Sequence, residues 1–300
     1  MQGTSPVAGP RAWRPPPCPE RKTPLLRSFI TACLLGALAV PATSQTLDRI
    51  KAEGEIRLGY RQDAEPMSYV DEAGLPAGYT VTLCGELARA LGRALELDEI
   101  EIKFVPVDTS NRFAKIVNGE IDLLCGAASI TMSRREFVDF SIPVFVDGTA
   151  VMLPTGAQAS FSALNGQKVG VRAGTTTQEA LTNTLSDTGT DAEVVTFDSH
   201  SDGMAAMENG DLAAYFADQS ILLYLNKGNQ DFMVMDRLLT IEKQGLALPR
   251  GDTEFRFMVD GALSGMYGAG IMGRIFRETL PGVEPGEAML WLYRLGPILP

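Results

Sequence analysis

The residues best suited to chemistry in this 300-residue sequence are arginines that follow short β-rich runs. Hydroxyl side chains accompany them, and the segments in question are Arg61, Asp108 to Arg112, Gly126 to Arg134 and Arg172 to Thr177. Arginine holds a carboxylate through two parallel charge-assisted hydrogen bonds, and Gly-Thr-Thr at a helix start offers backbone N–H groups. Each arginine taken alone could equally be a solvated or ion-paired surface residue. Their shared position after strands favours a binding site for a small anionic ligand.

The sequence offers few groups for catalysis or metal binding. It has one histidine, His200, and two of its four cysteines lie in the first 44 residues, so the rest cannot build a multi-histidine or four-cysteine metal site. Neither a Gly-x-Ser-x-Gly elbow nor a P-loop is present. Gly268 to Gly273 matches a dinucleotide-binding pattern, but no strand is predicted before it. We therefore expect no catalytic residue, no metal and no cofactor.

Residues 1–44 have the order of a secretory signal peptide. Five basic side chains precede the apolar run Phe29 to Val40, and small residues follow as far as Ser44. An uncleaved membrane anchor is the alternative, although this apolar run is short for a bilayer span. Ile30 to Cys33 resembles a lipoprotein cleavage box, but most of the apolar region follows it, which disfavours lipidation. We expect export to the periplasm, which leaves about 256 residues.

The composition indicates a globular, acidic protein. Hydrophobic residues make up 45% and charged residues 21%, which argues against disorder. The net charge of −11 becomes about −15 without the basic leader, and a field of this sign repels phosphate backbones, so nucleic acid is not an expected partner. Beyond the leader, Cys84 and Cys125 could form one disulfide in an oxidising compartment or remain two buried free thiols.

Strand-like and helical runs alternate in two series. The predicted strands are 56–60, 102–107 and 121–125 in the first series and 168–171, 193–197 and 212–216 in the second. The predicted helices are 81–95 and 112–118, then 176–185 and 202–208, and in the tail 254–266 and 287–295. Two α/β series predict two lobes whose ligand site lies at the carboxyl ends of the strands. We expect lobe 1 at 45–145 and 245–300, lobe 2 at 149–240, and crossings near 144–148 and 240–244.

Several motifs, in one order along the chain, carry a family resemblance. They are Gly59 to Tyr69, Gly78 to Cys84, Asn111 to Phe113, Asp122 to Gly126, Arg134 to Ser141, Gly174 to Thr176 and Tyr215 to Asp218. Together they resemble the periplasmic amino-acid-binding proteins of ABC importers, solute-binding protein family 3, and are most similar to the glutamate/aspartate-binding branch. The resemblance implies an α/β, type II periplasmic-binding-protein fold, with a mostly parallel sheet flanked by helices in each lobe and a two-crossover hinge. It also implies a monomer that delivers an amino acid to an ABC permease.

The resemblance implies roles for residues around the ligand's α-carbon. Arg134 matches the arginine that clamps the α-carboxylate, assisted by Ser129, Thr175 and Thr176. Asp218 matches the acid that receives the α-ammonium group. These five residues are expected to hold the part that all amino acids share.

A second set matches the positions that meet a side-chain carboxylate. These are Arg61, Thr109, Arg112 and His200, although His200 could instead belong to a polar helix start. Ala127 stands where relatives often carry Ser or Thr, so only its backbone is expected to contribute. The choice among glutamate, aspartate and their amides therefore stays open.

Two other functions compete with transport. A few proteins of this fold are enzymes such as dehydratases, but His200 has no sequence-evident nucleophile partner. A sensor's ligand-binding module is the other alternative, and the sequence shows no membrane segment or signalling domain after the lobes. We expect a binding protein whose lobes close on the ligand, since contacts divided between lobes favour the closed state.

Overall fold

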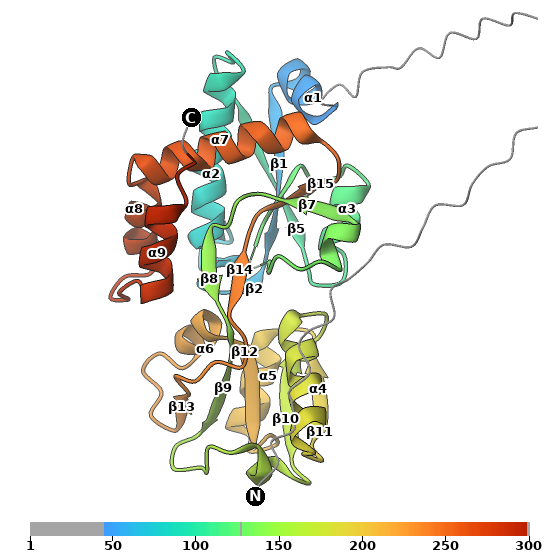
Figure 1. Cartoon of the computed structure of the whole chain (residues 1–300), viewed down its shortest axis with the longest axis vertical. Coiled ribbons are helices and arrows are strands. Elements are labelled where there is room, and N and C mark those ends of the chain that lie inside the picture. The colour runs from blue at the N-terminus through green and yellow to red at the C-terminus, as the bar shows by residue number, and fades with distance from the viewer. Residues whose placement is uncertain (1–44, 127, 299–300) are drawn as a thin grey trace, which may run out of the picture. The chain divides into compact units, whose positions relative to one another are not determined.

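The structure is a computed structural model that describes residues 45–126 and 128–298. The predicted signal peptide and Ala127 therefore lie outside the described residues. In the described part of the chain, no helix has both the length and the apolar composition that a membrane span needs. The described chain forms two lobes, each built on a five-stranded sheet (Figure 1). The predicted two-lobe α/β fold is confirmed.

The first lobe has the strand order β5-β1-β6-β15-β7, and β15 alone runs against its neighbours. Its strands are β1 (Glu55–Arg61), β5 (Glu101–Val107), β6 (Leu123–Cys125), β7 (Val138–Phe140) and β15 (Ala247–Pro249). Its helices are α1 (Gln45–Glu53), α2 (Tyr79–Ala94), α3 (Arg112–Val117), α7 (Thr253–Gly268), α8 (Ile271–Thr279) and α9 (Glu287–Leu295). A small antiparallel sheet follows β1 and contains β2 (Asp63–Ala64), β3 (Ser68–Val70) and β4 (Pro76–Ala77).

The second lobe repeats this arrangement with the order β11-β10-β12-β9-β13, in which β9 is the antiparallel strand. Its strands are β9 (Thr149–Pro154), β10 (Lys168–Arg172), β11 (Glu193–Phe197), β12 (Ala214–Asp218) and β13 (Phe232–Val234). Its helices are α4 (Thr176–Thr188), α5 (His200–Glu208) and α6 (Gln219–Leu225). The carboxyl ends of β10 and β12 thus carry Arg172 and Asp218 to one edge of this sheet.

Two crossovers join the lobes and pair with each other. They are β8 (Phe145–Asp147) and β14 (Glu242–Gln244), which form an antiparallel ladder between the lobes (Figure 1). Gly148 follows β8, and a Cβ at this position would lie 2.1 Å from the carbonyl oxygen of Thr240. Only glycine therefore allows the crossovers to run so close together. Each crossover continues directly into the antiparallel strand of the next sheet, β9 or β15.

Separate apolar cores hold the two lobes. In the first, Leu83, Leu87 and Leu91 recur every four residues and form the buried face of α2 against the sheet. Phe255, Val259 and Leu263 do the same for α7 in that core. In the second, the buried residues include Val169, Val171, Leu181, Phe216 and Tyr215. Apolar spacing thus produced the helices that the sequence predicted.

The predicted helices and strands are present, with small shifts at their ends. The strand predicted at 212–216 is β12 at Ala214–Asp218, so Asp218 both ends the strand and stands at the N-cap of α6. The prediction did not include α1, α6 and the strands β2, β3, β4, β7, β9, β13 and β15. Gly268 ends α7 and α8 begins at Ile271, so the dinucleotide-like pattern lies at a junction between helices.

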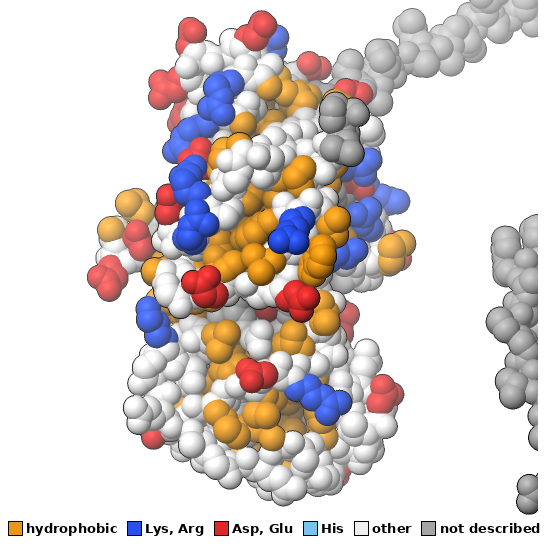
Figure 2. All heavy atoms as spheres, turned by 60° about the vertical axis from the view of Figure 1, so that its left-hand side comes forward, with side chains coloured by type: hydrophobic (Ala, Val, Ile, Leu, Met, Phe, Trp, Pro, Cys, Tyr) orange, Lys and Arg blue, Asp and Glu red, His pale blue; other side chains and the backbone are white. Residues whose placement is uncertain are grey.

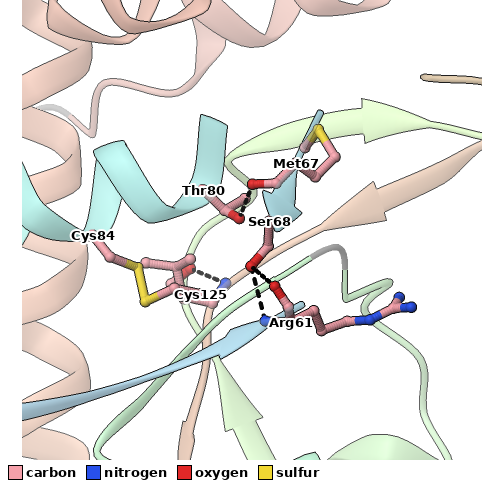
Figure 3. Close-up of a disulfide and its surroundings, with 8 residues drawn as sticks. Arg61, Met67, Ser68, Thr80, Cys84 and Cys125 are labelled. Atoms are coloured by element: carbon pink, nitrogen blue, oxygen red, sulfur yellow. Dashed lines mark hydrogen bonds between the residues drawn. A yellow bond between two sulfur atoms is a disulfide. The ribbon is translucent and has the colours of Figure 1, made fainter. Parts of the chain in front are cut away.

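A disulfide joins the first lobe's helix α2 to its sheet (Figure 3). Cys84 of α2 and Cys125 of β6 are bonded and both are buried, so of the two alternatives the structure has the disulfide. Beside it, Ser68 Oγ accepts a hydrogen bond from the backbone N–H of Arg61 at 2.9 Å and donates one to its carbonyl oxygen at 3.1 Å. These bonds fix the backbone from which the Arg61 side chain extends.

Replacing both Cys84 and Cys125 with Ser is expected to lower the free energy of unfolding by about 2–4 kcal/mol. The disulfide spans 41 sequence positions, and a cross-link over such a loop restricts the unfolded chain. Urea unfolding followed by circular dichroism measures the change, and wild-type protein treated with a reducing agent is the matched control. An unchanged unfolding midpoint in both samples would contradict this prediction.

Candidate ligand-binding site

A narrow cavity of about 10 Å³ lies between the lobes, at the carboxyl ends of the strands, and in this closed arrangement it has room for about one water molecule. Its lining includes eight of the ten ligand-binding residues predicted from the sequence: Arg61, Arg112, Ser129, Arg134, Thr175, Thr176, His200 and Asp218. Arg172, Thr177, Ala217 and Ile221 line it as well. Thr109 does not line the cavity but lies in the turn after β5, next to Gly174, and Ala127 is outside the described residues.

Arg134 and the N-terminus of α4 form one side of this cavity. Arg134 Nη1 donates a hydrogen bond to the carbonyl oxygen of Ser129 at 2.8 Å, and its guanidinium lies 5.4 Å from the ring centre of Phe113. Ser129 Oγ lies 3.3 Å from Thr176 Oγ1, across the gap between the lobes. Thr175 Oγ1 caps α4 by accepting a hydrogen bond from the backbone N–H of Gln178. The N-terminus of a helix favours anions. An anionic group here would meet an arginine and a helix N-terminus together.

Two acids stand next to this anion-favouring side. Asp218 accepts hydrogen bonds from Thr177 Oγ1 at 3.3 Å and from Gln244 Nε2 at 2.9 Å. Burial, together with the charges of Asp147 and Glu242, raises the pKa of Asp218 to about 7. Glu242 accepts a hydrogen bond from Thr176 Oγ1 at 2.8 Å. Acids beside an arginine and a helix N-terminus complement the ammonium and carboxylate groups of an α-amino acid.

The other end of the cavity holds two arginines bridged by one carboxylate. Arg61 Nε and Nη2 donate to Asp63 Oδ1 at 3.1 and 2.8 Å, and Arg172 Nε donates to Asp63 Oδ2 at 2.8 Å. His200 Nδ1 lies 3.0 Å from the hydroxyl of Tyr215, while its Nε2 is buried without a partner. Burial, with the charge of Arg61, lowers the pKa of His200 to about 3, so the ring is neutral.

Of the arginines that line this cavity, Arg112 is the one that is fully buried without an ion pair among the described residues. Its side chain is buried, and its Nη2 donates only to the carbonyl oxygen of Gly174 at 3.3 Å, across the gap between the lobes. Burial and the charges of Arg61 and Arg134 lower the pKa of Arg112 well below its usual range. Within the described chain, Arg61 and Arg172 form ion pairs, but neither Arg112 nor Arg134 does. A bound carboxylate would supply the missing counter-charge.

Unpartnered buried atoms also point to a ligand. Five buried side-chain atoms of the described residues lack a hydrogen-bond partner, and two of them, Arg112 Nε and His200 Nε2, belong to residues that line the cavity. A third, Gln244 Oε1, belongs to a residue that bonds to Asp218. Buried polar groups without partners are costly and therefore rare in folded proteins. Their concentration around one cavity indicates that a polar ligand completes the site.

The candidate set chosen from the sequence omitted several residues of the site. Arg172 ends β10 as Arg61 ends β1, so the strand-end argument that selected Arg61 applies to it equally. Asp63 and Glu242 gave no comparable signal, because they belong to a two-residue strand and to a crossover. Their place in the site depends on how the lobes meet, which the sequence pattern does not encode.

A second, larger hollow lies beside the crossovers. It is lined mainly by apolar side chains, among them Phe145, Leu223, Ile241, Leu280 and Val283. On the face shown in Figure 2, hydrophobic side chains gather over both lobes, with charged side chains among them. This hollow lacks the grouped arginines of the first cavity, so it is the poorer candidate for a small anionic ligand.

Comparison with known proteins identifies the family. Residues 56–280 match the bacterial extracellular solute-binding proteins, family 3. The chain belongs to this family. This solute-binding protein is 30% identical to the L-glutamate/L-aspartate-binding protein of Pseudomonas aeruginosa over 271 residues, which cover 88% of this chain and 90% of that protein.

Solved structures share the fold of this solute-binding protein. The solute receptor for L-cysteine of Neisseria gonorrhoeae matches with a TM-score of 0.71 and 26% identity, covering 80% of this chain and 97% of that one. The ancestral amino acid-binding protein AncCDT-1, a precursor of cyclohexadienyl dehydratase, matches with a TM-score of 0.69 and 27% identity, covering 78% and 98%. Proteins with this fold therefore bind different amino acids.

Amino-acid binding is expected to release a proton near pH 6.5. A ligand ammonium beside Asp218 favours its ionised form, so binding lowers the pKa of Asp218 from about 7. Affinity should therefore rise with pH up to about 7, by at most about tenfold per pH unit. Calorimetric titrations in two buffers of different ionisation enthalpy measure the proton released.

The same titrations at pH 8.5 are the control, because Asp218 is then already ionised and no proton should be released. Equal apparent enthalpies in the two buffers at pH 6.5 would contradict the assignment of Asp218 to the ammonium group.

Proposed function

We propose that this protein captures L-glutamate or L-aspartate outside the cytoplasm and delivers it to an ABC permease. The observation that carries the proposal is the cavity between the lobes, where buried arginines exceed the acids paired with them. The order of residues 1–44 is that of a secretory signal peptide, which supports a periplasmic location. We also propose that the protein is a monomer and that it is not an enzyme.

The arrangement of charges supports an amino acid as the ligand. Arg134, Ser129 and the start of α4 would hold the α-carboxylate, and Asp218 would receive the α-ammonium group. These groups come from both lobes, so a ligand held by all of them stabilises the closed arrangement. In the proposed mechanism, the permease recognises the closed lobes.

The charge at the rest of the cavity favours an acidic side chain. Arg112 is buried without a carboxylate partner, and Nε2 of the neutral His200 has no partner either. A side-chain carboxylate would accept hydrogen bonds from both, whereas an amide would supply no counter-charge to Arg112. The similarity to a relative named for L-glutamate and L-aspartate agrees with this interpretation.

Purified protein without its leader, freed of bound ligand by unfolding and refolding, is expected to bind L-glutamate and L-aspartate. The matching amides, L-glutamine and L-asparagine, should bind at least about tenfold more weakly because they lack the charge that Arg112 needs. L-leucine is the apolar control. Isothermal titration calorimetry measures all five affinities, and equal binding of acids and amides, or binding of leucine alone, would refute the proposal.

Two arginine variants distinguish contacts to the ligand's α-carboxylate from contacts to its side chain. Arg134→Ala should weaken acids and amides alike by more than about a hundredfold, since both share the α-carboxylate. Arg112→Ala should weaken the acids more than the amides, because its proposed partner is the side-chain carboxylate. Arg89→Ala, which removes an exposed arginine of the same lobe, is the control and should change neither. Equal losses for acids and amides in Arg112→Ala would contradict its role.

A further inference from the structure

Asp63 does not line the cavity itself, but it is a carboxylate of the protein that pairs with two of the arginines lining it. Its Oδ1 pairs with Arg61 of the first lobe at 2.8 Å, and its Oδ2 pairs with Arg172 of the second lobe, also at 2.8 Å. Both arginines line the cavity, and their side chains are 3% and 5% exposed. One carboxylate of the protein thus forms ion pairs with two buried arginines from different lobes.

The position of Asp63 is fixed by its neighbours. Ala64, the next residue, is completely buried in the apolar core of the second lobe, although β2 belongs to the first. Arg172 is held on its other side, where Nη1 donates to the carbonyl oxygen of Phe197 at 3.2 Å. Moving the backbone at Asp63 away from the arginines would therefore expose Ala64, and turning its side chain away would break both ion pairs.

This arrangement sets the net charge that the ligand side chain meets. Arg61, Arg112 and Arg172 contribute three positive charges, Asp63 contributes one negative charge, and His200 is neutral. The group therefore carries two net positive charges. Without Asp63 it would carry three, and without Arg172 it would carry one.

We propose that Asp63 is a specificity-determining residue that lowers the positive charge met by the ligand side chain and so weakens the preference for side chains with a larger negative charge. The proposal rests on the proposed function and adds to it a residue that disfavours more highly charged ligands. The charge of Asp63 should affect ligands of different charge to different extents. Its effect therefore appears in the ratio of the affinities for two ligands rather than in one affinity alone. A purely structural role would weaken all ligands equally and leave these ratios unchanged.

The test measures the affinities of L-glutamate, L-glutamine and O-phospho-L-serine at pH 8, where the phosphate carries close to two charges. Asp63→Asn keeps the shape of the side chain and removes its charge. It should raise the preference for glutamate over glutamine, and for phosphoserine over glutamate, by about tenfold or more. Arg172→Gln should lower both preferences by a similar factor, and the double variant should return them close to the wild-type values.

Glu120→Gln is the matched control, because it removes one negative charge from an exposed residue of the same lobe that pairs with Lys115 outside the cavity. Both ratios should stay at the wild-type value in this variant. Unchanged ratios in Asp63→Asn, with glutamate still bound, would overturn the proposal. So would a change in the same direction in Asp63→Asn and Arg172→Gln.

The two proposals fail in different ways. Wild-type protein that binds none of the acids would contradict the proposed function. In that case, binding of phosphoserine or glutamate that first appears in Asp63→Asn would still support the role of Asp63, and its absence would overturn that role too. If Asp63→Asn does not fold, the shift expected for Arg172→Gln tests the same charge balance from the other side.

Discussion

The positive charge of Arg112, buried between the lobes, is the constraint on which the rest of the site depends. Taking a guanidinium out of water is costly unless a counter-charge and hydrogen bonds replace the water. In the described chain, Arg112 donates one hydrogen bond, to the backbone carbonyl oxygen of Gly174 in the other lobe, and it has no ion pair. The closed arrangement therefore buries a charge that the protein does not neutralise. In the proposed function, a carboxylate ligand would remove this penalty and would thereby couple binding to closure.

The fold brings such charges together because of how its sheets are built. Parallel strands end at one edge, and the two lobes turn these edges toward the same cavity, where Arg61 and Arg172 end β1 and β10. Local bonds then hold each backbone in place, such as the two between Ser68 and Arg61 and the cap of α4 at Thr175. The crossovers contribute more than a connection, since Glu242 and Gln244 of β14 bond to Thr176 and Asp218.

The sequence predicted the parts of the structure that have strong local signals. Arg61 and Arg134 follow or end apolar strands of the first lobe, so their position at one edge of its sheet could be inferred from the sequence, whereas Asp218 was selected through the family resemblance. Asp63 could not be found this way, because a two-residue strand has no periodicity and its partner Arg172 lies 109 positions away in the other lobe. The pairing of Cys84 with Cys125 was likewise open, since the sequence does not fix how close α2 lies to β6.

The two ends of the cavity differ in how firmly they define a ligand. The end with Arg134 and Asp218 suits groups that every α-amino acid carries, which agrees with a fold whose members bind several amino acids. The other end is a balance of charges among Arg61, Asp63, Arg172 and Arg112, so replacing one residue there changes its net charge by a full unit. Overall identity of 25–30% leaves many such replacements possible. Substrate preference in this family should therefore follow the charge count at this end more closely than it follows overall identity.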